Sequence, residues 1–117
     1  NNSSILSHAS YAGLTVYSAT KHAVTGLTKG AAVELAQSNI RVNAVGPGPI
    51  NTPMLSDPTD GHPEVFGGMV PMNRIGTPKE VSNAVMWLFS EESAYVTGHT
   101  LMIDGGFCSG PIVSGAE

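Results

Sequence analysis

The sequence is poor in charge and in cysteine. Charged residues make up 12% of its 117 residues, and Cys108 is its one cysteine. The five Lys and Arg residues are scattered and the net charge is −4, so there is no cationic cluster to meet the phosphates of a nucleic acid. A lone cysteine cannot form an internal disulfide, and it is typical of a reducing, cytoplasmic compartment.

Long apolar runs are also lacking. No run approaches the roughly 20 residues of a membrane span, and no signal peptide is visible at the start of the sequence. We therefore expect no membrane partner. The dinucleotide fingerprint G-x-G-x-x-G is absent, and the chain begins Asn1-Asn2-Ser3-Ser4 with no strand before its first loop. We predict one domain at most (residues 1–117), and the chain reads as if it starts in the middle of a larger fold.

A strand–helix–strand unit is predicted at the start of the chain. Residues 1–4 fit the end of a strand, and a helix is predicted from residue 15 or 16 to Ala36, because apolar residues recur there at helical spacing. The face that this spacing predicts to be buried consists of Ala23, Leu27, Ala31 and Leu35, widened by Ala19, Val24 and Ala32. Asn39 is predicted to end the helix in a left-handed conformation. Residues 40–45 are β-branched and largely apolar, and they predict a buried strand parallel to the first.

A second helix and a last strand follow. Thr77 is predicted to cap this helix, with proline at the first helical position and Glu80 completing a capping box. The helix is expected to end near Ser90, and its predicted buried residues are Val81, Ala84, Val85, Leu88 and Trp87. Residues 100–104 predict the last strand, and residues 108–117 form a tail with no clear pattern.

Tyr17 and Lys21 are four residues apart, which places them one turn apart on the same face of the first predicted helix. A phenol has an ordinary pKa of about 10. A neighbouring ammonium group favours the phenolate, so this pairing predicts a tyrosine that acts as a general acid or base. Ser4 would hydrogen-bond the same substrate oxygen. Most isolated pairs of this spacing are only surface neighbours, so the motif by itself is weak.

The carboxyl ends of parallel strands are where ligands bind in open α/β sheets. Ser4, Tyr17 and the turn Gly46-Pro47-Gly48-Pro49 are all expected at that edge, with the Thr52 hydroxyl nearby. Residues 51–73 are rich in proline and glycine and carry several apolar side chains. A loop of this length is usually functional, and we predict that it is a lid over the substrate.

These stretches together resemble the short-chain dehydrogenase/reductase family over roughly residues 1–107. The resemblance rests on motifs in the family's order: Asn2-Ser3-Ser4, Tyr17-Ser18-Ala19-Thr20-Lys21, Ile40-Arg41-Val42-Asn43, Pro47-Gly48 with Thr52, Arg74-Ile75-Gly76, Val96-Thr97-Gly98 and Asp104-Gly105-Gly106. The spacing from Ser4 to Tyr17 is the family's usual one. The resemblance implies an α/β, Rossmann-like doubly wound parallel sheet, present as its C-terminal half of about three strands with flanking helices.

The resemblance also implies an oxidoreductase that moves a hydride between NAD or NADP and a secondary alcohol or ketone. Tyr17 would be the acid or base, Lys21 would lower its pKa and bind the nicotinamide ribose, and Ser4 would orient the substrate oxygen. The remaining implied nicotinamide contacts are Pro47, Gly48, Ile50 (through its backbone) and Thr52. We further predict substrate contacts at Ser4, Leu6, Tyr11, Pro49 and Met54.

The N-terminal half of the family's pattern is absent, including its phosphate loop and the residue that selects NAD or NADP. We therefore expect the 117 residues alone to be inactive. Apolar residues in the loop favour a partly apolar substrate, with a sugar as the alternative. Gly26 and Gly30 suggest close helix packing, which fits the tetramers common in the family.

Three other functions compete with this one. A serine hydrolase would need the elbow G-x-S-x-G, which is absent. A metal site would need ligand spacing that the four histidines lack. A non-catalytic relative used for binding or assembly stays open, although such proteins usually lose the tyrosine or the lysine, and both are present here.

Overall fold

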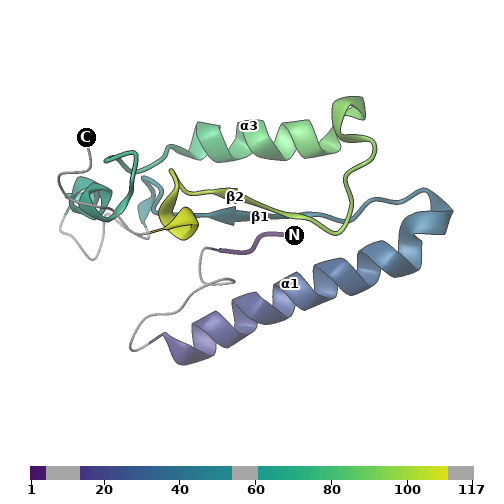
Figure 1. Ribbon diagram of the computed structural model, residues 1–117. Helices are drawn as coiled ribbons and strands as arrows, with labels where there is room; N and C mark the ends of the chain where they lie inside the picture. The colour runs from purple at the N-terminus through teal and green to yellow at the C-terminus, as the bar shows by residue number, and fades with distance from the viewer. Residues whose placement is uncertain (5–13, 54–60, 111–117) are drawn as a thin grey trace.

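Two short parallel strands lie at the centre of the chain. The computed structural model describes residues 1–4, 14–53 and 61–110. Strand β1 (Ala44–Pro47) pairs with β2 (Thr100–Ile103), with Ala44 opposite Thr100. On the other side of β1, Asn2 forms a parallel bridge with Val45. The three segments therefore run in the same direction and end at one edge, which confirms the parallel α/β arrangement (Figure 1).

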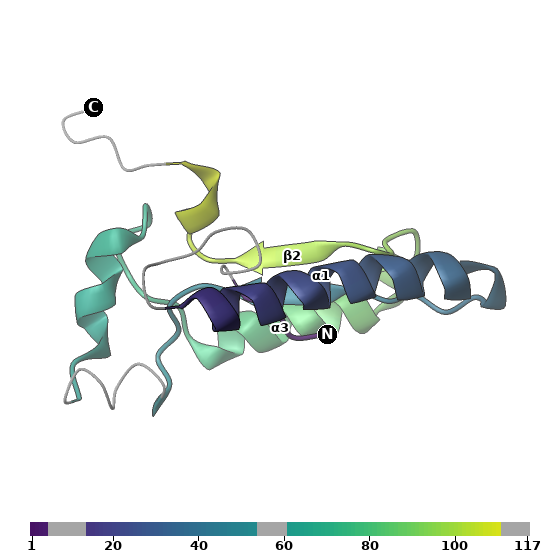
Figure 2. The same cartoon turned by 90° about the horizontal axis from the view of Figure 1, so that it is seen from below.

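Two long helices lie on opposite sides of these strands (Figures 1 and 2). Helix α1 (Thr15–Leu35) connects the N-terminal segment to β1, and α3 (Pro78–Phe89) precedes β2. Segments of 3₁₀ helix span Ala36–Ser38, Pro63–Met69, Glu91–Ser93 and Phe107–Ser109. The buried apolar residues are Ala32, Ala44, Val45, Val70 and Leu88. Within the described ranges, no helix is long and apolar enough to cross a membrane.

The second of the predicted strands is displaced along the chain. It is predicted at residues 40–45, whereas β1 begins at Ala44. The preceding residues are held by side-chain hydrogen bonds to a distant loop instead of by a regular ladder. Arg41 donates to the carbonyls of Leu88 and Val96 at 2.8 and 3.1 Å, and Asn43 donates to Val96 at 2.9 Å. These bonds tie the start of β1 to the end of α3.

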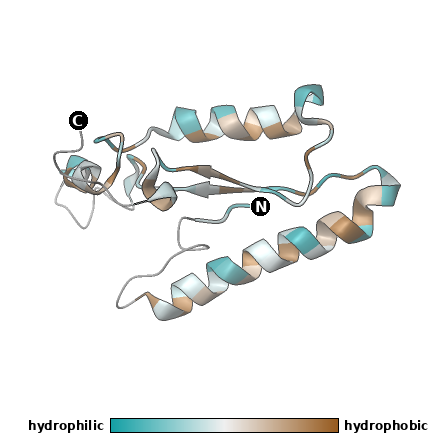
Figure 3. Cartoon of the chain, in the orientation of Figure 1, coloured by the Kyte–Doolittle hydropathy of each residue, from teal (hydrophilic) through white to brown (hydrophobic). Residues whose placement is uncertain are grey.

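The predicted buried face of α1 is wrong for its leucines, whereas Ala32, which belongs to that face, is buried. Leu27 is 67% exposed and Leu35 is 37% exposed. The fully buried residues of this helix are Ser18, Thr28 and Ala32. Two of these three side chains carry a hydroxyl group, whereas the pattern predicted buried leucines. Figure 3 shows hydrophobic and hydrophilic segments alternating along α1. The ends of the helix agree with the prediction, and Asn39 has the expected left-handed backbone, with φ of 60°.

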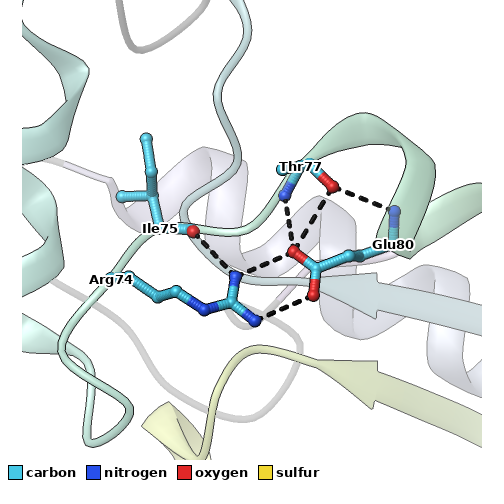
Figure 4. Close-up of polar contacts among 4 residues, drawn as sticks. All are labelled: Arg74, Ile75, Thr77 and Glu80. Atoms are coloured by element: carbon cyan, nitrogen blue, oxygen red, sulfur yellow. Dashed lines mark hydrogen bonds and ion pairs between the residues drawn. The ribbon is translucent and has the colours of Figure 1, made fainter.

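Helix α3 begins with the predicted capping box. The Thr77 hydroxyl accepts a hydrogen bond from the Glu80 N–H at 3.2 Å, and the Glu80 carboxylate accepts one from the Thr77 N–H at 3.1 Å. Arg74 pairs with the same carboxylate (Figure 4). Leu88 is buried as predicted, but Trp87 is 40% exposed. The cap therefore fixes where α3 begins and how it is joined to the segment before it.

Candidate active site

Tyr17 and Lys21 lie on the first two turns of α1, and both are half-buried. The Lys21 ammonium nitrogen is 5.4 Å from the centroid of the Tyr17 ring. A cation at this distance over an aromatic face is attracted by the ring's negative face. The helical spacing predicted from the sequence therefore brings the positive charge against the phenol.

Lys21 also connects the helix to the N-terminal segment. Its ammonium group donates a hydrogen bond to the Asn2 carbonyl at 3.4 Å. Asn2 is the residue that bridges to Val45 of β1. The lysine is thus held at the sheet, with its partner tyrosine one turn closer to the start of α1.

Ser4 lies toward the same edge and is the last described residue of the N-terminal segment (residues 1–4). It is half-buried, and its carbonyl oxygen lies 3.3 Å from the position that a Cβ on Gly46 would take. Asn1 is joined to Thr28 and Asn2 to Lys21, so the segment and the helix run past each other in opposite directions. Each step along the segment from Asn1 toward Ser4 therefore corresponds to a step along α1 from Thr28 toward Tyr17. Both residues therefore lie toward the edge where the strands end.

The turn after β1 is packed against the end of β2. The Gly48 N–H donates to the Ile103 carbonyl at 3.0 Å. A Cβ on Gly48 would lie 2.9 Å from the Cβ of Asp104, which leaves no room for a side chain. The glycine of the Pro47-Gly48 turn is therefore required by the close approach of Asp104.

Ile50 and Thr52 follow this turn. The N–H groups of Asn51 and Gly76 are used in backbone hydrogen bonds, to the carbonyls of Gly76 and Pro49, both at 2.9 Å. The Ile50 N–H has no hydrogen-bond partner within the described part of the chain. The Thr52 hydroxyl donates to the Ile50 carbonyl at 3.4 Å. One backbone donor and one hydroxyl are thus available for an amide-bearing ligand.

Three predicted substrate contacts, Leu6, Tyr11 and Met54, lie outside the described residues. Pro49 lines a cavity of about 350 Å³ at the carboxyl end of β2, together with Val70 and Met72. Neither Tyr17 nor Lys21 lines this cavity. It therefore adjoins the turn after β1 without including the tyrosine and lysine.

Sequence reasoning missed several polar links that hold the site. The Asn1 side chain donates to the buried Thr28 hydroxyl at 2.8 Å, and Arg74 pairs with Glu80. The Arg74 pair could have been found from the opposite charges that flank the predicted cap. The Asn1 contact has no local sequence signal, because 27 residues separate its partners. Among the described residues, no group of three His, Cys, Asp or Glu could hold a metal ion.

Comparisons with known proteins match dehydrogenases and reductases. A family model described as enoyl-(acyl carrier protein) reductase matches residues 1–108. The short-chain dehydrogenase anuF of Penicillium roqueforti is 47% identical over 93 residues, which cover 77% of this chain and 34% of that protein. The 3-oxoacyl-(acyl-carrier-protein) reductase FabG of Thermotoga maritima is 45% identical over 106 residues, which cover 91% of this chain and 43% of that protein.

Solved structures give the same result. The structure of ElxO with NADP bound superimposes with a TM-score of 0.85 at 41% identity, covering 94% of this chain and 46% of that one. The ligand-free aldohexose dehydrogenase of Thermoplasma acidophilum has a TM-score of 0.90 at 35% identity, covering 100% of this chain and 50% of that one. The chain therefore spans half or less of the length of these relatives.

Proposed function

Because the chain belongs to the short-chain dehydrogenase/reductase family, we propose that it is the proton-handling part of an NAD(P)-dependent oxidoreductase that interconverts a secondary alcohol and a ketone. The observation that carries the proposal is the Tyr17–Lys21 pair. The ammonium group lies 5.4 Å from the ring centroid, and it is held there by the Asn2 carbonyl. Since these relatives are about twice as long or longer, the activity belongs to the full-length protein.

The roles follow from the chemistry of each side chain. In the reductive direction the Tyr17 phenol gives its proton to the carbonyl oxygen, and in the oxidative direction the phenolate takes one from the alcohol. The Lys21 cation compensates the negative charge that develops on the phenol. The Ser4 hydroxyl donates to the same substrate oxygen and orients it. A bound nicotinamide supplies the hydride chemistry.

The residues after β1 fit a nicotinamide. Its carboxamide needs donors and acceptors at the edge of the sheet, and the Ile50 N–H is unpaired among the described residues. We assign that donor and the Thr52 hydroxyl to the carboxamide, and the Pro47-Gly48 turn to the face of the ring. Whether NAD or NADP is used stays open. The relative whose structure holds NADP is a precedent for the class of cofactor.

We assign residues 51–73 to a substrate lid. Val70 and Met72, at the end of this segment, line the cavity beside Pro49. The lining also includes the charged side chains of Arg74, Glu80 and Asp104. Its apolar part favours a partly apolar alcohol or ketone over a sugar. Replacing Met72 with Ser should raise KM for an apolar ketone more than for a sugar alcohol. An equal effect on both substrates would contradict this assignment.

We also propose a cytoplasmic homotetramer. The outward side of α1 exposes Leu27 and Val33, at 67% and 80%, and a Cβ on Gly26 or Gly30 would meet nothing within 4 Å. Such a surface suits packing against another helix. Sedimentation of the full-length protein should give the mass of four chains, and Leu27→Glu should lower it. A monomeric wild-type protein would contradict the proposal.

The decisive experiment replaces Tyr17 with Phe in the full-length protein. Loss of the proton donor should reduce kcat by about 10²–10⁴-fold, while nicotinamide binding, measured by fluorescence titration, stays within about twofold of wild type. Tyr95→Phe is the matched control, since Tyr95 is fully exposed. Unchanged turnover in Tyr17→Phe would reject the role of Tyr17. Carbonyl reduction by the 117 residues alone would reject the need for further chain.

A further inference from the structure

The side of α1 that faces the N-terminal segment carries an unusual stripe. Its residues alternate at spacings of three and four: Ser18, Lys21, Thr25, Thr28 and Ala32. Ser18, Thr28 and Ala32 are 4%, 0% and 3% exposed. A helix face buried on a sheet is normally apolar. Here three of the five side chains carry hydroxyl groups.

Thr28 is the anchor of this stripe. Its hydroxyl accepts a hydrogen bond from the Asn1 side-chain amide at 2.8 Å and donates one to the Val24 carbonyl at 2.8 Å. Asn1 is in turn held by β1, because its carbonyl accepts the Val45 N–H at 2.9 Å. Thr28 therefore joins the helix to the sheet through a buried, fully used hydroxyl.

The position of Thr28 on the helix relates it to the proposed catalytic pair. At 3.6 residues per turn, Tyr17, Lys21 and Thr28 fall within about 40° around the helix axis, with Thr28 between the other two. Thr28 is about 16 Å from Tyr17 along the axis. A hydrogen bond there fixes the rotation of the face that presents Tyr17 and Lys21, and it fixes how far the helix slides along the strand.

The stripe is better suited to setting register than to adding stability. Two hydroxyl oxygens, Ser3 Oγ on the N-terminal segment and Thr25 Oγ1 on α1, are buried and have no partner among the described residues. Unsatisfied buried hydroxyls destabilise a contact that apolar side chains would stabilise. Directional polar contacts, by contrast, are satisfied in only one register.

We propose that Thr28, through its hydrogen bond with Asn1, is a positioning residue that sets the register of α1 and thereby places Tyr17 and Lys21 against the substrate oxygen. The inference rests on the proposed function. Thr28 is remote from the reacting atoms, but its loss should lower kcat. The reason is that small misplacements of the reacting groups have large effects on rate.

The test compares Thr28→Val and Thr28→Ser in the full-length protein. Valine keeps the shape and removes the hydroxyl, and kcat should fall about tenfold, since a 1 Å misplacement can cost as much as about 100-fold. KM for the nicotinamide should stay within about twofold. Serine keeps the hydroxyl and should restore most of kcat. Asn1→Ala removes the same bond from the exposed partner without altering the core, and it should reproduce the valine effect.

Thr20→Val is the matched control, because the Thr20 hydroxyl also donates to a carbonyl four residues earlier, at 2.9 Å, but is exposed. It should leave kcat unchanged. Equal losses in Thr28→Val and Thr28→Ser would mean that packing, not the hydrogen bond, matters, and would overturn the inference. So would an unchanged kcat in Asn1→Ala. If Tyr17→Phe is inactive while these variants are unaffected, this inference alone fails.

Discussion

Arg74 and Glu80 are joined by two hydrogen bonds, from the two terminal guanidinium nitrogens to the two carboxylate oxygens, at 2.8 and 2.9 Å (Figure 4). The same carboxylate completes the capping box of α3 by accepting the Thr77 N–H. The ion pair is therefore part of the cap, and it joins the end of the 51–73 segment to the start of a helix.

The first prediction concerns the pKa of Glu80. The Arg74 hydrogen bonds and then the Thr77 N–H lower this pKa from its ordinary value of 4.5 to about 2. Because the folded value lies below the unfolded one, the contribution to stability is present above about pH 4.5 and is lost as the pH falls toward 2. Carboxyl NMR titration should give the low value, and Arg74→Gln should raise it.

Lys79→Gln is the control for this titration, because it removes a positive charge from the same turn, and Lys79 makes no ion pair with Glu80 among the described residues. It should move the pKa of Glu80 much less than Arg74→Gln does. Both side chains of the pair are more than two fifths exposed, so added salt should also raise the pKa. A Glu80 pKa near 4.5 in the wild-type protein would contradict the prediction.

The second prediction concerns the Thr77 cap itself. Thr77→Ala removes the hydroxyl that accepts the Glu80 N–H, and it should lower the free energy of unfolding by about 1 kcal/mol. Thr77→Ser should retain most of the stability. Ser82→Ala, on the exposed side of the same helix, is the control and should change stability by less than about 0.5 kcal/mol. Denaturant unfolding measures the stability of all three variants. If Thr77→Ala were as stable as the wild type, the cap would not contribute to stability and the prediction would be wrong.

The cap and the helix ends could be predicted because their signals are local. Threonine, proline and glutamate at fixed offsets begin α3, and the periodic pattern of α1 gave its length. The buried face of α1 could not be predicted in this way. Hydropathy scores leucine as buried and threonine as neutral, whereas Thr28 is buried because its hydroxyl is satisfied by the Val24 carbonyl and by Asn1. The second of these partners is distant in sequence.

The start of β1 was missed for a related reason. Ile40 and Val42 are β-branched and favour a strand. The positions of residues 40–43 are instead decided by Arg41 and Asn43, whose side chains bind carbonyls near residues 88–96. The candidate site was easier, because Tyr17 and Lys21 are one helical turn apart and their contact is local. Their link to Asn2 depends on the parallel arrangement of the N-terminal segment and β1.

The third prediction concerns the turn after β1. Gly48→Ala would place a Cβ 2.9 Å from the Asp104 Cβ and 3.0 Å from its Cα. Since one of these is a backbone atom, the turn must shift, and we expect a loss of roughly 1–3 kcal/mol in unfolding free energy. Gly68→Ala is the control, because a Cβ there would meet nothing within 4 Å. Equal stability of the two variants would show that the turn can accommodate a Cβ beside Asp104, and it would contradict the prediction.

The last prediction concerns Cys108, which lies in the turn after β2. Partial burial, followed by the hydrogen bond and charge of Asp104, raises the pKa of this thiol to about 11. The Asp104 carboxylate also accepts the N–H groups of Gly106 and Cys108 at 3.0 and 2.9 Å, so its negative charge is fixed beside the sulfur. The thiol should therefore be protonated at neutral pH, although the residue is at the surface.

Alkylation by iodoacetamide tests this, because the thiolate is the reacting form. At pH 8 the folded protein should react roughly 200-fold more slowly than an ordinary cysteine with a pKa of about 8.5, in proportion to its thiolate fraction, and the rate should keep rising up to about pH 11. Asp104→Asn removes the neighbouring charge while keeping a hydrogen-bond acceptor, and it should speed the reaction. The unfolded protein in denaturant supplies the reference rate for the same thiol. If the folded protein were alkylated at pH 8 as fast as the unfolded protein, neither burial nor Asp104 would raise the pKa of the thiol.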